Sequence, residues 1–154
     1  MNTFDGFRLI GDWHEPGPYQ GALALPVDEQ GRVLLQLRDE IEGIIAPGKW
    51  GLFGGEIEPG ECAQAAVARE FEEETGLVYA KDEFRPAYYL NTGPPRFGVL
   101  KIFVLKLTDP VSAIRTYEGT GFACATRRQG EKLDLIDYLR PVLADFWDNM
   151  PDGP

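Results

Sequence analysis

The sequence predicts a mixed β-sheet with helices on its faces, a layered domain of the α/β or α+β class. Short apolar runs recur along the chain with Gly, Pro and Asp turns between them, which is typical of β-strands. Two longer segments, 62–75 and 133–149, have the composition or spacing of helices. The chain has 154 residues, enough to bury one core, so we expect a single domain over 1–154.

The expected strands follow an N-terminal segment with little signal. Gly11, Pro16 and Pro18 interrupt residues 1–18, which predicts an irregular N-terminal arm or cap there. The turn Asp28–Gly31 joins the first two apolar runs and predicts a hairpin. The expected strands are Tyr19–Val27, Arg32–Arg38, Trp50–Gly55, Phe84–Asn91, Val99–Thr108 and Gly121–Thr126.

Two helices complete the expected layers. Residues 62–75 are rich in Ala and Glu, which are strong helix formers, and Gly76 suits a left-handed helix end. In 133–149 the apolar residues recur at the spacing of an amphipathic C-terminal helix. Pro141 is expected to start or kink the second part of that helix.

The charge balance restricts the partners. The chain has 15 Lys+Arg against 25 Asp+Glu, a net charge of −10, which repels a nucleic-acid backbone. Long nucleic acid is therefore not an expected partner. A small polyanion still binds where a divalent cation reverses the local sign of the charge.

The composition also restricts the chemistry. Cys62 and Cys124 lack the spacing of a disulfide framework or zinc site, and a lone His14 excludes a multi-histidine metal site. Carboxylates must therefore carry the chemistry. No stretch approaches the roughly 20 apolar residues that span a bilayer, and the N-terminus does not resemble a signal peptide. We expect a cytoplasmic protein without membrane partners.

Three carboxylates share one face of the expected helix 62–75. At about 100° per residue, Glu70, Glu73 and Glu74 fall within roughly a third of the helix circumference. The same stripe holds apolar residues two turns earlier, at Ala63, Ala66 and Val67. The stripe should therefore face the protein body, with the carboxylates lining a cleft. Such a density of hard oxygen ligands suits Mg²⁺ or Mn²⁺, and Mg²⁺ shares its ligands readily with substrate phosphates.

The spacing around this helix resembles the Nudix box. Gly55 is followed after five residues by Glu61, and after seven more by Arg69-Glu70-Phe71-Glu72-Glu73-Glu74-Thr75-Gly76-Leu77. All nine specified positions match over 23 residues, which is a specific signal. The resemblance implies a three-layer αβα sandwich, the Nudix fold. Phe53 departs from the proline that many relatives carry before the paired glycines.

The resemblance also implies an activity: Mg²⁺-dependent hydrolysis of a pyrophosphate bond in a nucleoside diphosphate linked to another moiety. Glu70, Glu73 and Glu74 would hold the metal with the backbone carbonyl of Gly54. Gly55, Glu61 and Arg69 would support the geometry between loop and helix. The base that takes the proton from water is a box glutamate or an acidic residue outside the box, for which Glu118 is the candidate and Glu131 the second.

The substrate is less defined. Arg38, Lys49 and Arg96 are candidate phosphate contacts, although each residue is more often structural. The stretch Arg38–Leu52 resembles members that act on nucleoside triphosphates or sugar nucleotides, and Pro94 and Pro95 hint at ADP-ribose-type substrates. The alternatives are a nucleotide-sensing module without catalysis and, on the same fold, an isomerase. Many relatives dimerise, so a homodimer is a further expectation.

Overall fold

The computed structural model describes residues 3–11, 17–40, 46–93, 97–115 and 121–149. The strands are β1 (Thr3–Phe4), β2 (Phe7–Ile10), β3 (Tyr19–Val27), β4 (Val33–Leu37), β5 (Trp50–Gly51), β6 (Phe53–Glu56), β7 (Phe84–Thr92), β8 (Gly98–Lys106) and β9 (Gly121–Ala125). The helices are α1 (Ala63–Thr75), α2 (Arg127–Gly130) and α3 (Leu139–Asp148), with short 3₁₀ turns at Lys81–Glu83 and Val111–Ala113.

One mixed sheet contains all nine described strands. Its centre is β3, which runs parallel to β8 over nine residue pairs. The hairpin of β3 and β4 is paired only at Val27 and Val33, so the two strands diverge beyond their turn. The segment 50–56 then crosses between them: β5 pairs with β4, and β6 pairs with β3.

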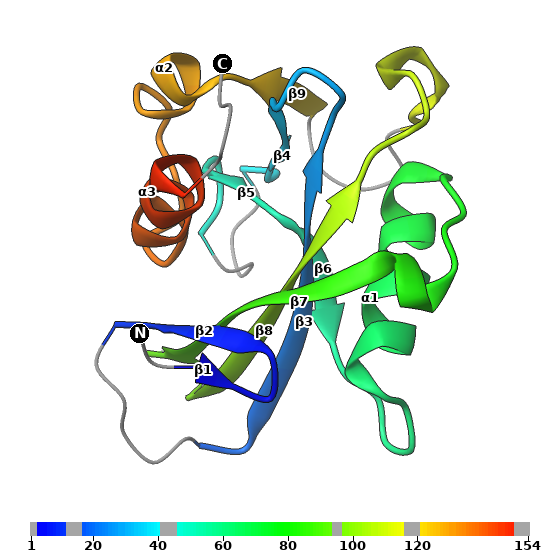
Figure 1. Cartoon of the computed structure of the whole chain (residues 1–154), viewed down its shortest axis with the longest axis vertical. Coiled ribbons are helices and arrows are strands. Elements are labelled where there is room, and N and C mark those ends of the chain that lie inside the picture. Colours follow the sequence, from blue (N-terminus) through cyan, green and yellow to red (C-terminus); the bar gives the residue numbers. More distant parts are fainter. Residues whose placement is uncertain (1–2, 12–16, 41–45, 94–96, 116–120, 150–154) are drawn as a thin grey trace.

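The sheet separates two hydrophobic clusters. Along β3, Ala22 and Ala24 belong to the cluster under α1, whereas Leu23 and Leu25 belong to the cluster under α3. This alternation follows from the two-residue period of a strand. Figure 1 shows α1 and α3 on opposite sides of the sheet. The predicted layering of helix, sheet and helix is confirmed.

The helix α1 matches its predicted bounds closely. Cys62 caps its start, where the sulfur accepts a hydrogen bond from the N–H of Ala65 at 3.4 Å. Gly76 ends it with a left-handed φ of 77°, and its N–H donates to the carbonyl of Glu72 at 2.8 Å. Phe71 anchors the buried face, with its ring edge-on to that of Phe53 at 5.5 Å between centroids. The orientation of α1 is thereby fixed by packing against the sheet.

The N-terminal segment is a correction. An irregular arm or cap was predicted over 1–18, but Thr3–Phe4 and Phe7–Ile10 form a hairpin, and β2 continues the sheet parallel to β7. Asp5 and Gly6 both have positive φ, 49° and 84°, which is the two-residue turn that an Asp-Gly pair favours. Phe7 is buried in the cluster under α1 and holds the hairpin in place. Residues 12–16 lie outside the described residues.

The C-terminal helix is also shorter than predicted. Helix was expected over 133–149, but α3 begins at Leu139. Leu135 forms an isolated parallel bridge with Trp50 instead, and the N–H of Ile136 donates to the Trp50 carbonyl at 2.9 Å. Pro141 lies in the first turn of α3, where its missing N–H has no intrahelical partner to lose. None of the helices in the described ranges is long and apolar enough to cross a membrane.

Candidate active site

Glu74 is the most deeply placed of the three predicted carboxylates. It lies in the last turn of α1 and is 4% exposed. The backbone N–H of Gly54 donates a hydrogen bond to Glu74 Oε1 at 2.8 Å, which joins the end of α1 to β6. Burying a carboxylate is costly unless it is hydrogen-bonded, and this bond meets part of that need. The carboxylate is therefore held at a defined place beside β6.

Two glycines give the carboxylates access to the β6 backbone. Gly54 has a φ of 145°, and a Cβ there would clash with the carbonyl oxygen of Ala22. A Cβ on Gly55 would lie 2.7 Å from Glu70 Oε1. Gly54 is thus required by its conformation, whereas Gly55 is required by the closeness of the Glu70 carboxylate.

Arg69 organises the acidic groups around it. Its Nε and Nη2 donate to both oxygens of Glu61, at 2.8 and 3.0 Å, as a bidentate pair. Its Nη1 donates to Glu70 Oε1 at 3.0 Å and reaches Glu73 Oε1 at 3.4 Å. A guanidinium suits this role because its donors have a fixed planar arrangement. The predicted pairing of Arg69 with Glu61 is present, and it fastens the loop before α1 to the helix.

The contact between Arg69 and Glu61 shifts the pKa values of both groups so that each is more easily charged. Hydrogen bonds from the Arg69 guanidinium and the Glu58 N–H lower the pKa of Glu61 to about 2. The hydrogen bond to the Glu61 carboxylate raises the pKa of Arg69 above its ordinary value. Both groups are therefore charged throughout the neutral range, and the loop stays fastened there.

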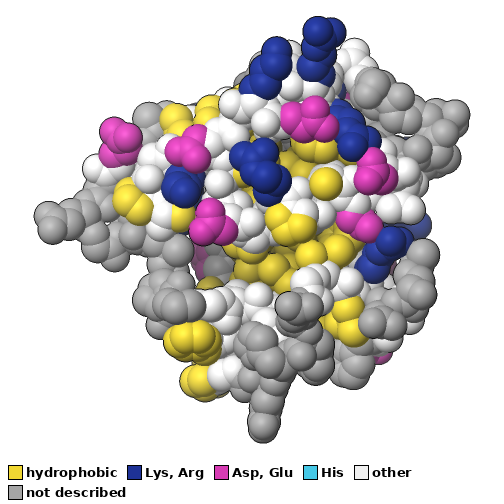
Figure 2. Space-filling model, turned by 90° about the vertical axis from the view of Figure 1, so that its left-hand side faces the viewer, with side chains coloured by type: hydrophobic (Ala, Val, Ile, Leu, Met, Phe, Trp, Pro, Cys, Tyr) yellow, Lys and Arg dark blue, Asp and Glu magenta, His cyan; other side chains and the backbone are white. Residues whose placement is uncertain are grey.

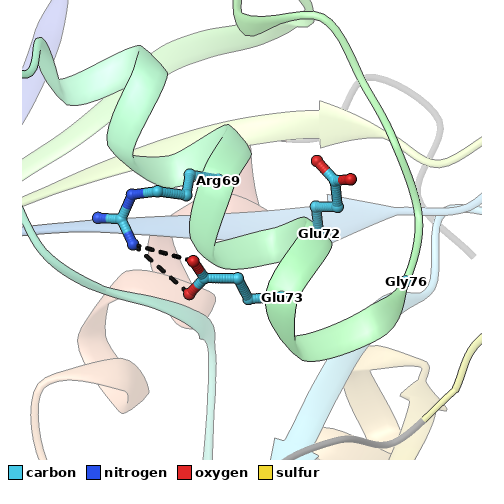
Figure 3. A pocket seen from close by; sticks show the side chains of 4 residues that line it. All are labelled: Arg69, Glu72, Glu73 and Gly76. Atoms are coloured by element: carbon cyan, nitrogen blue, oxygen red, sulfur yellow. Dashed lines mark hydrogen bonds and ion pairs between the residues drawn. The ribbon is translucent and has the colours of Figure 1, made fainter.

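Glu73 is the most exposed of the three, with 55% of its side chain accessible. This exposure is compatible with the expected cleft, because Glu73 also borders an open hollow. An open hollow of about 570 Å³ lies beside Arg69, Glu72, Glu73 and Gly76. Figure 3 shows the Glu73 carboxylate turned toward the Arg69 guanidinium, whereas Glu72 points away from it. Glu73 faces solvent because it lies on the edge of the stripe.

The described carboxylates are engaged with protein groups. In the described part of the chain, no three acidic, Cys or His side chains are close enough together to hold a metal ion. Glu74 is instead bonded to the Gly54 N–H, and Glu70 and Glu73 contact Arg69. The donor set still fits a hard divalent cation, since it offers carboxylate oxygens beside a strand with no side chain at Gly54 or Gly55.

The other predicted site residues are distributed around this centre. Arg38 follows β4, and its N–H donates to the Lys49 carbonyl at 2.9 Å. The Lys49 ammonium lies 3.8 Å from Asp137. Glu131, the second candidate base, pairs with Arg127 at 2.9 Å beside α2, which lies across the sheet from α1 (Figure 1). Arg96 and Glu118 lie outside the described residues.

Sequence reasoning missed two features near the centre. It overlooked the backbone N–H of Gly54 as the partner of Glu74, since residue identities do not show where backbone donors point. It also placed Tyr138 inside a helix, although Tyr138 precedes α3 and packs partly buried against the cluster under α3. Pro141 was the available signal for the start of α3, because it restricts how far upstream the helix can begin.

Figure 2 shows the face of the molecule on the α3 side. Hydrophobic side chains gather at the middle of this face, with charged groups around them.

The fold and the box together define a family. The family model described as the NUDIX domain matches residues 17–113, more than half of the chain. The chain therefore belongs to the Nudix family.

Individual relatives agree with this assignment. A protein of Bacillus subtilis (strain 168), provisionally named an 8-oxo-dGTP diphosphatase, is 32% identical over an alignment of 83 residues that covers 48% of this chain and 52% of that protein. The chain thus spans about half the length of that curated relative. The crystal structure of the MutT protein from Methanosarcina mazei Go1 is 25% identical, with a TM-score of 0.68 over 83% of this chain and 91% of that chain.

A third comparison concerns the fold alone. The structure of the E. coli dihydroneopterin triphosphate pyrophosphohydrolase is 18% identical, with a TM-score of 0.67 over 85% of this chain and 96% of that chain. The arrangement of sheet and helices is therefore shared with this structure, while the sequences have diverged.

Proposed function

We propose that this protein hydrolyses a pyrophosphate bond in a nucleoside diphosphate linked to another moiety, with Mg²⁺ as cofactor. The substrate class includes nucleoside triphosphates, sugar nucleotides and ADP-ribose-type compounds. The observation that carries the proposal is the complete Nudix box, whose Glu74 is buried and bonded to Gly54 while Arg69 fastens Glu61. The name of the Bacillus subtilis relative supports a nucleoside triphosphate as one substrate.

Each residue of the box has a role in the proposal. Glu70, Glu73 and Glu74 would hold the cation together with the Gly54 carbonyl. Mn²⁺ fits the same oxygen donors. When bound, the cation would supply neutralising charge for the phosphoryl oxygens and would lower the pKa of the attacking water. Arg69 holds Glu70 and Glu73 near this position through its contacts at 3.0 and 3.4 Å.

The proposal assigns proton transfer to a carboxylate and substrate contact to three basic residues. A box glutamate or Glu118 takes the proton from the attacking water as general base. Arg38 directly follows β4 and Lys49 directly precedes β5, whereas Arg96 falls between β7 and β8 in the sequence. These cations contribute to phosphate binding in a protein whose net charge is −10.

The test is a release assay for phosphate and pyrophosphate in Mg²⁺, with nucleoside triphosphates, ADP-ribose, nucleotide sugars and dinucleoside polyphosphates. Glu74→Gln should lower turnover by more than about a hundredfold, since even outer partners of metal ligands cost 10–100-fold. Glu72→Gln is the matched control, because it makes the same change on the same helix at an exposed position. It should leave turnover unchanged.

The alternative is a nucleotide-sensing module that keeps the fold without catalysis. The intact set of Glu70, Glu73 and Glu74 opposes this alternative. Absence of turnover with every substrate, combined with a nucleotide-dependent rise in melting temperature, would favour the sensing module. Equal turnover in wild type and Glu74→Gln would overturn the assignment of the box carboxylates.

A further inference from the structure

Tyr138 is held in a fixed position between two anchors. On one side, the N–H of Trp50 donates to the Asp134 carbonyl at 2.9 Å, and the N–H of Ile136 donates to the Trp50 carbonyl at 2.9 Å. On the other side, α3 begins at Leu139, whose side chain is fully buried. Only two residues, Asp137 and Tyr138, lie between the last strand contact and the helix, which leaves Tyr138 little freedom.

The phenol of Tyr138 lies above Gly51 of β5. A Cβ on Gly51 would lie 4.0 Å from Tyr138 Oη and 3.9 Å from Arg38 Cδ, so both side chains reach over this glycine. The Tyr138 oxygen also accepts a hydrogen bond from the backbone N–H of Leu52. Because the oxygen accepts the Leu52 N–H, its own O–H is not used in this bond and can donate to another group.

The bond to Glu74 comes from β6, the strand that begins directly after Leu52. The N–H groups of Leu52 and Gly54 are two residues apart, and in an extended strand such groups point to the same edge at a separation of about 7 Å. The Tyr138 oxygen and the Glu74 carboxylate are therefore neighbours along one edge of the segment 50–56. This places a phenol donor beside the predicted catalytic carboxylates, although Tyr138 comes from the opposite layer of the fold.

The charges around Tyr138 indicate what its O–H would bind. The Arg38 guanidinium and the Glu74 carboxylate both act electrostatically on the phenol, and burial is the main cause that raises its pKa. The phenol therefore stays protonated and remains a donor through the neutral range. A phenol O–H beside a guanidinium is a donor pair suited to an anionic oxygen such as that of a phosphate.

We propose that Tyr138 contacts the substrate, donating its O–H to an oxygen of the phosphate chain next to the phosphate that would bind the cation at Glu74. The proposal rests on the proposed function and adds a binding group outside the Nudix box. Because Arg38 lies on the same side of Gly51, the two residues would bind the phosphate chain and not the base. The contribution of Tyr138 to substrate affinity is therefore expected to be the same for every base.

The test is Tyr138→Phe, which removes only the O–H. Loss of a hydrogen bond to a charged group corresponds to about a tenfold to hundredfold rise in KM, and kcat should change less. The rise should be equal for nucleotides with the same phosphate chain and different bases. Tyr88→Phe is the matched control: its hydroxyl donates to Asp145 at 2.9 Å, away from the site, so KM should not change.

Calorimetry in Mg²⁺ separates this proposal from the proposed function. Inorganic triphosphate and a nucleotide with a non-hydrolysable bridge should both bind Tyr138→Phe about tenfold or more weakly than wild type. If wild type binds the analogue but hydrolyses nothing, the proposed function fails while the binding comparison still decides on Tyr138. An unchanged affinity, a change confined to one base, or no binding of either probe by wild type would overturn the proposal.

Discussion

At the scale of single residues, the ion pair of Arg69 and Glu61 predicts a pH dependence of stability. The guanidinium lowers the pKa of Glu61 from 4.5 to about 2 in the folded protein. Stability from this group is therefore fully present above about pH 4.5 and is lost as the pH falls toward 2. Glu61→Gln should lower the melting temperature at pH 6, and its difference from wild type should shrink as the pH falls through that window.

Thermal unfolding between pH 2 and 7 measures the effect. Glu72→Gln serves as the control, since it removes a carboxylate whose side chain points away from Arg69 (Figure 3). Its difference from wild type should not follow the same curve. A difference for Glu61→Gln that stays constant from pH 6 to pH 2 would contradict the assignment of the lowered pKa to the ion pair.

The sequence predicted side-chain partners better than backbone partners. Arg69 and Glu61 have opposite charges at a spacing that a loop before a helix brings together, so their pairing was expected. The bond from Gly54 to Glu74 depends on a φ of 145° at Gly54, which residue identity permits but does not specify. The contact of Tyr138 with Leu52 was equally hidden, because a backbone N–H belongs to every residue except proline.

At the scale of elements, one carboxylate ties α3 to the sheet. Asp145 accepts a hydrogen bond from the buried Tyr88 of β7 at 2.9 Å and pairs with Arg8 of β2 at 2.9 Å. Asp145→Ala should lower the free energy of unfolding by about 1–3 kcal/mol, because it leaves the Tyr88 hydroxyl buried without this partner. Urea unfolding measures the change.

An exposed ion pair on the same helix provides the control. Asp148 pairs with Arg127 at 2.7 Å, but both side chains are largely exposed, at 60% and 41%. Asp148→Ala should therefore cost less than about 1 kcal/mol. Equal losses in the two variants would mean that Asp145 acts as a surface charge and not as the tie between α3 and the sheet.

The elements that the sequence predicted correctly are those whose signals are local. The helix α1 has helix formers throughout and a glycine at its end, and both bounds were found to within a residue. In contrast, Leu133, Leu135 and Ile136 fit the apolar spacing of a helix but lie outside α3, because Leu135 pairs with Trp50 more than eighty positions earlier. A contact between distant residues has no local pattern, so it overrode the periodicity.

At the scale of the whole molecule, the sheet topology brings the site together. The site needs β3 and β4 to diverge so that the segment 50–56 can cross between them and meet both the end of α1 and the start of α3. The sequence predicted the strands from Tyr19 onward, but not β1, β2, the strand order or this divergence. Strand order depends on which hydrophobic faces match across the molecule, and apolar runs of similar length do not distinguish the alternatives.

The acidic charge of the whole protein predicts that any salt raises the melting temperature by screening. Binding of Mg²⁺ at the site is expected to raise it further. A net charge of −10 destabilises the compact state, and any salt relieves part of that repulsion. A cation that binds the folded state at Glu74 adds a further term, about 2.7 kcal/mol at a hundredfold excess over its dissociation constant. Millimolar Mg²⁺ should therefore raise the melting temperature more than NaCl of the same ionic strength.

The variants Glu74→Gln and Glu72→Gln separate the effect of salt screening from the effect of Mg²⁺ binding at the site. Glu74→Gln should keep the response to NaCl and lose the excess response to Mg²⁺, whereas Glu72→Gln should keep both, since each variant changes the net charge equally. Binding of Mg²⁺ must also compete with the contacts of Arg69 with Glu70 and Glu73, which hold these two carboxylates without a cation. An excess response that persists in Glu74→Gln would show that Mg²⁺ acts on the diffuse negative charge of the surface, and the carboxylates of α1 would then lose their assignment as ligands.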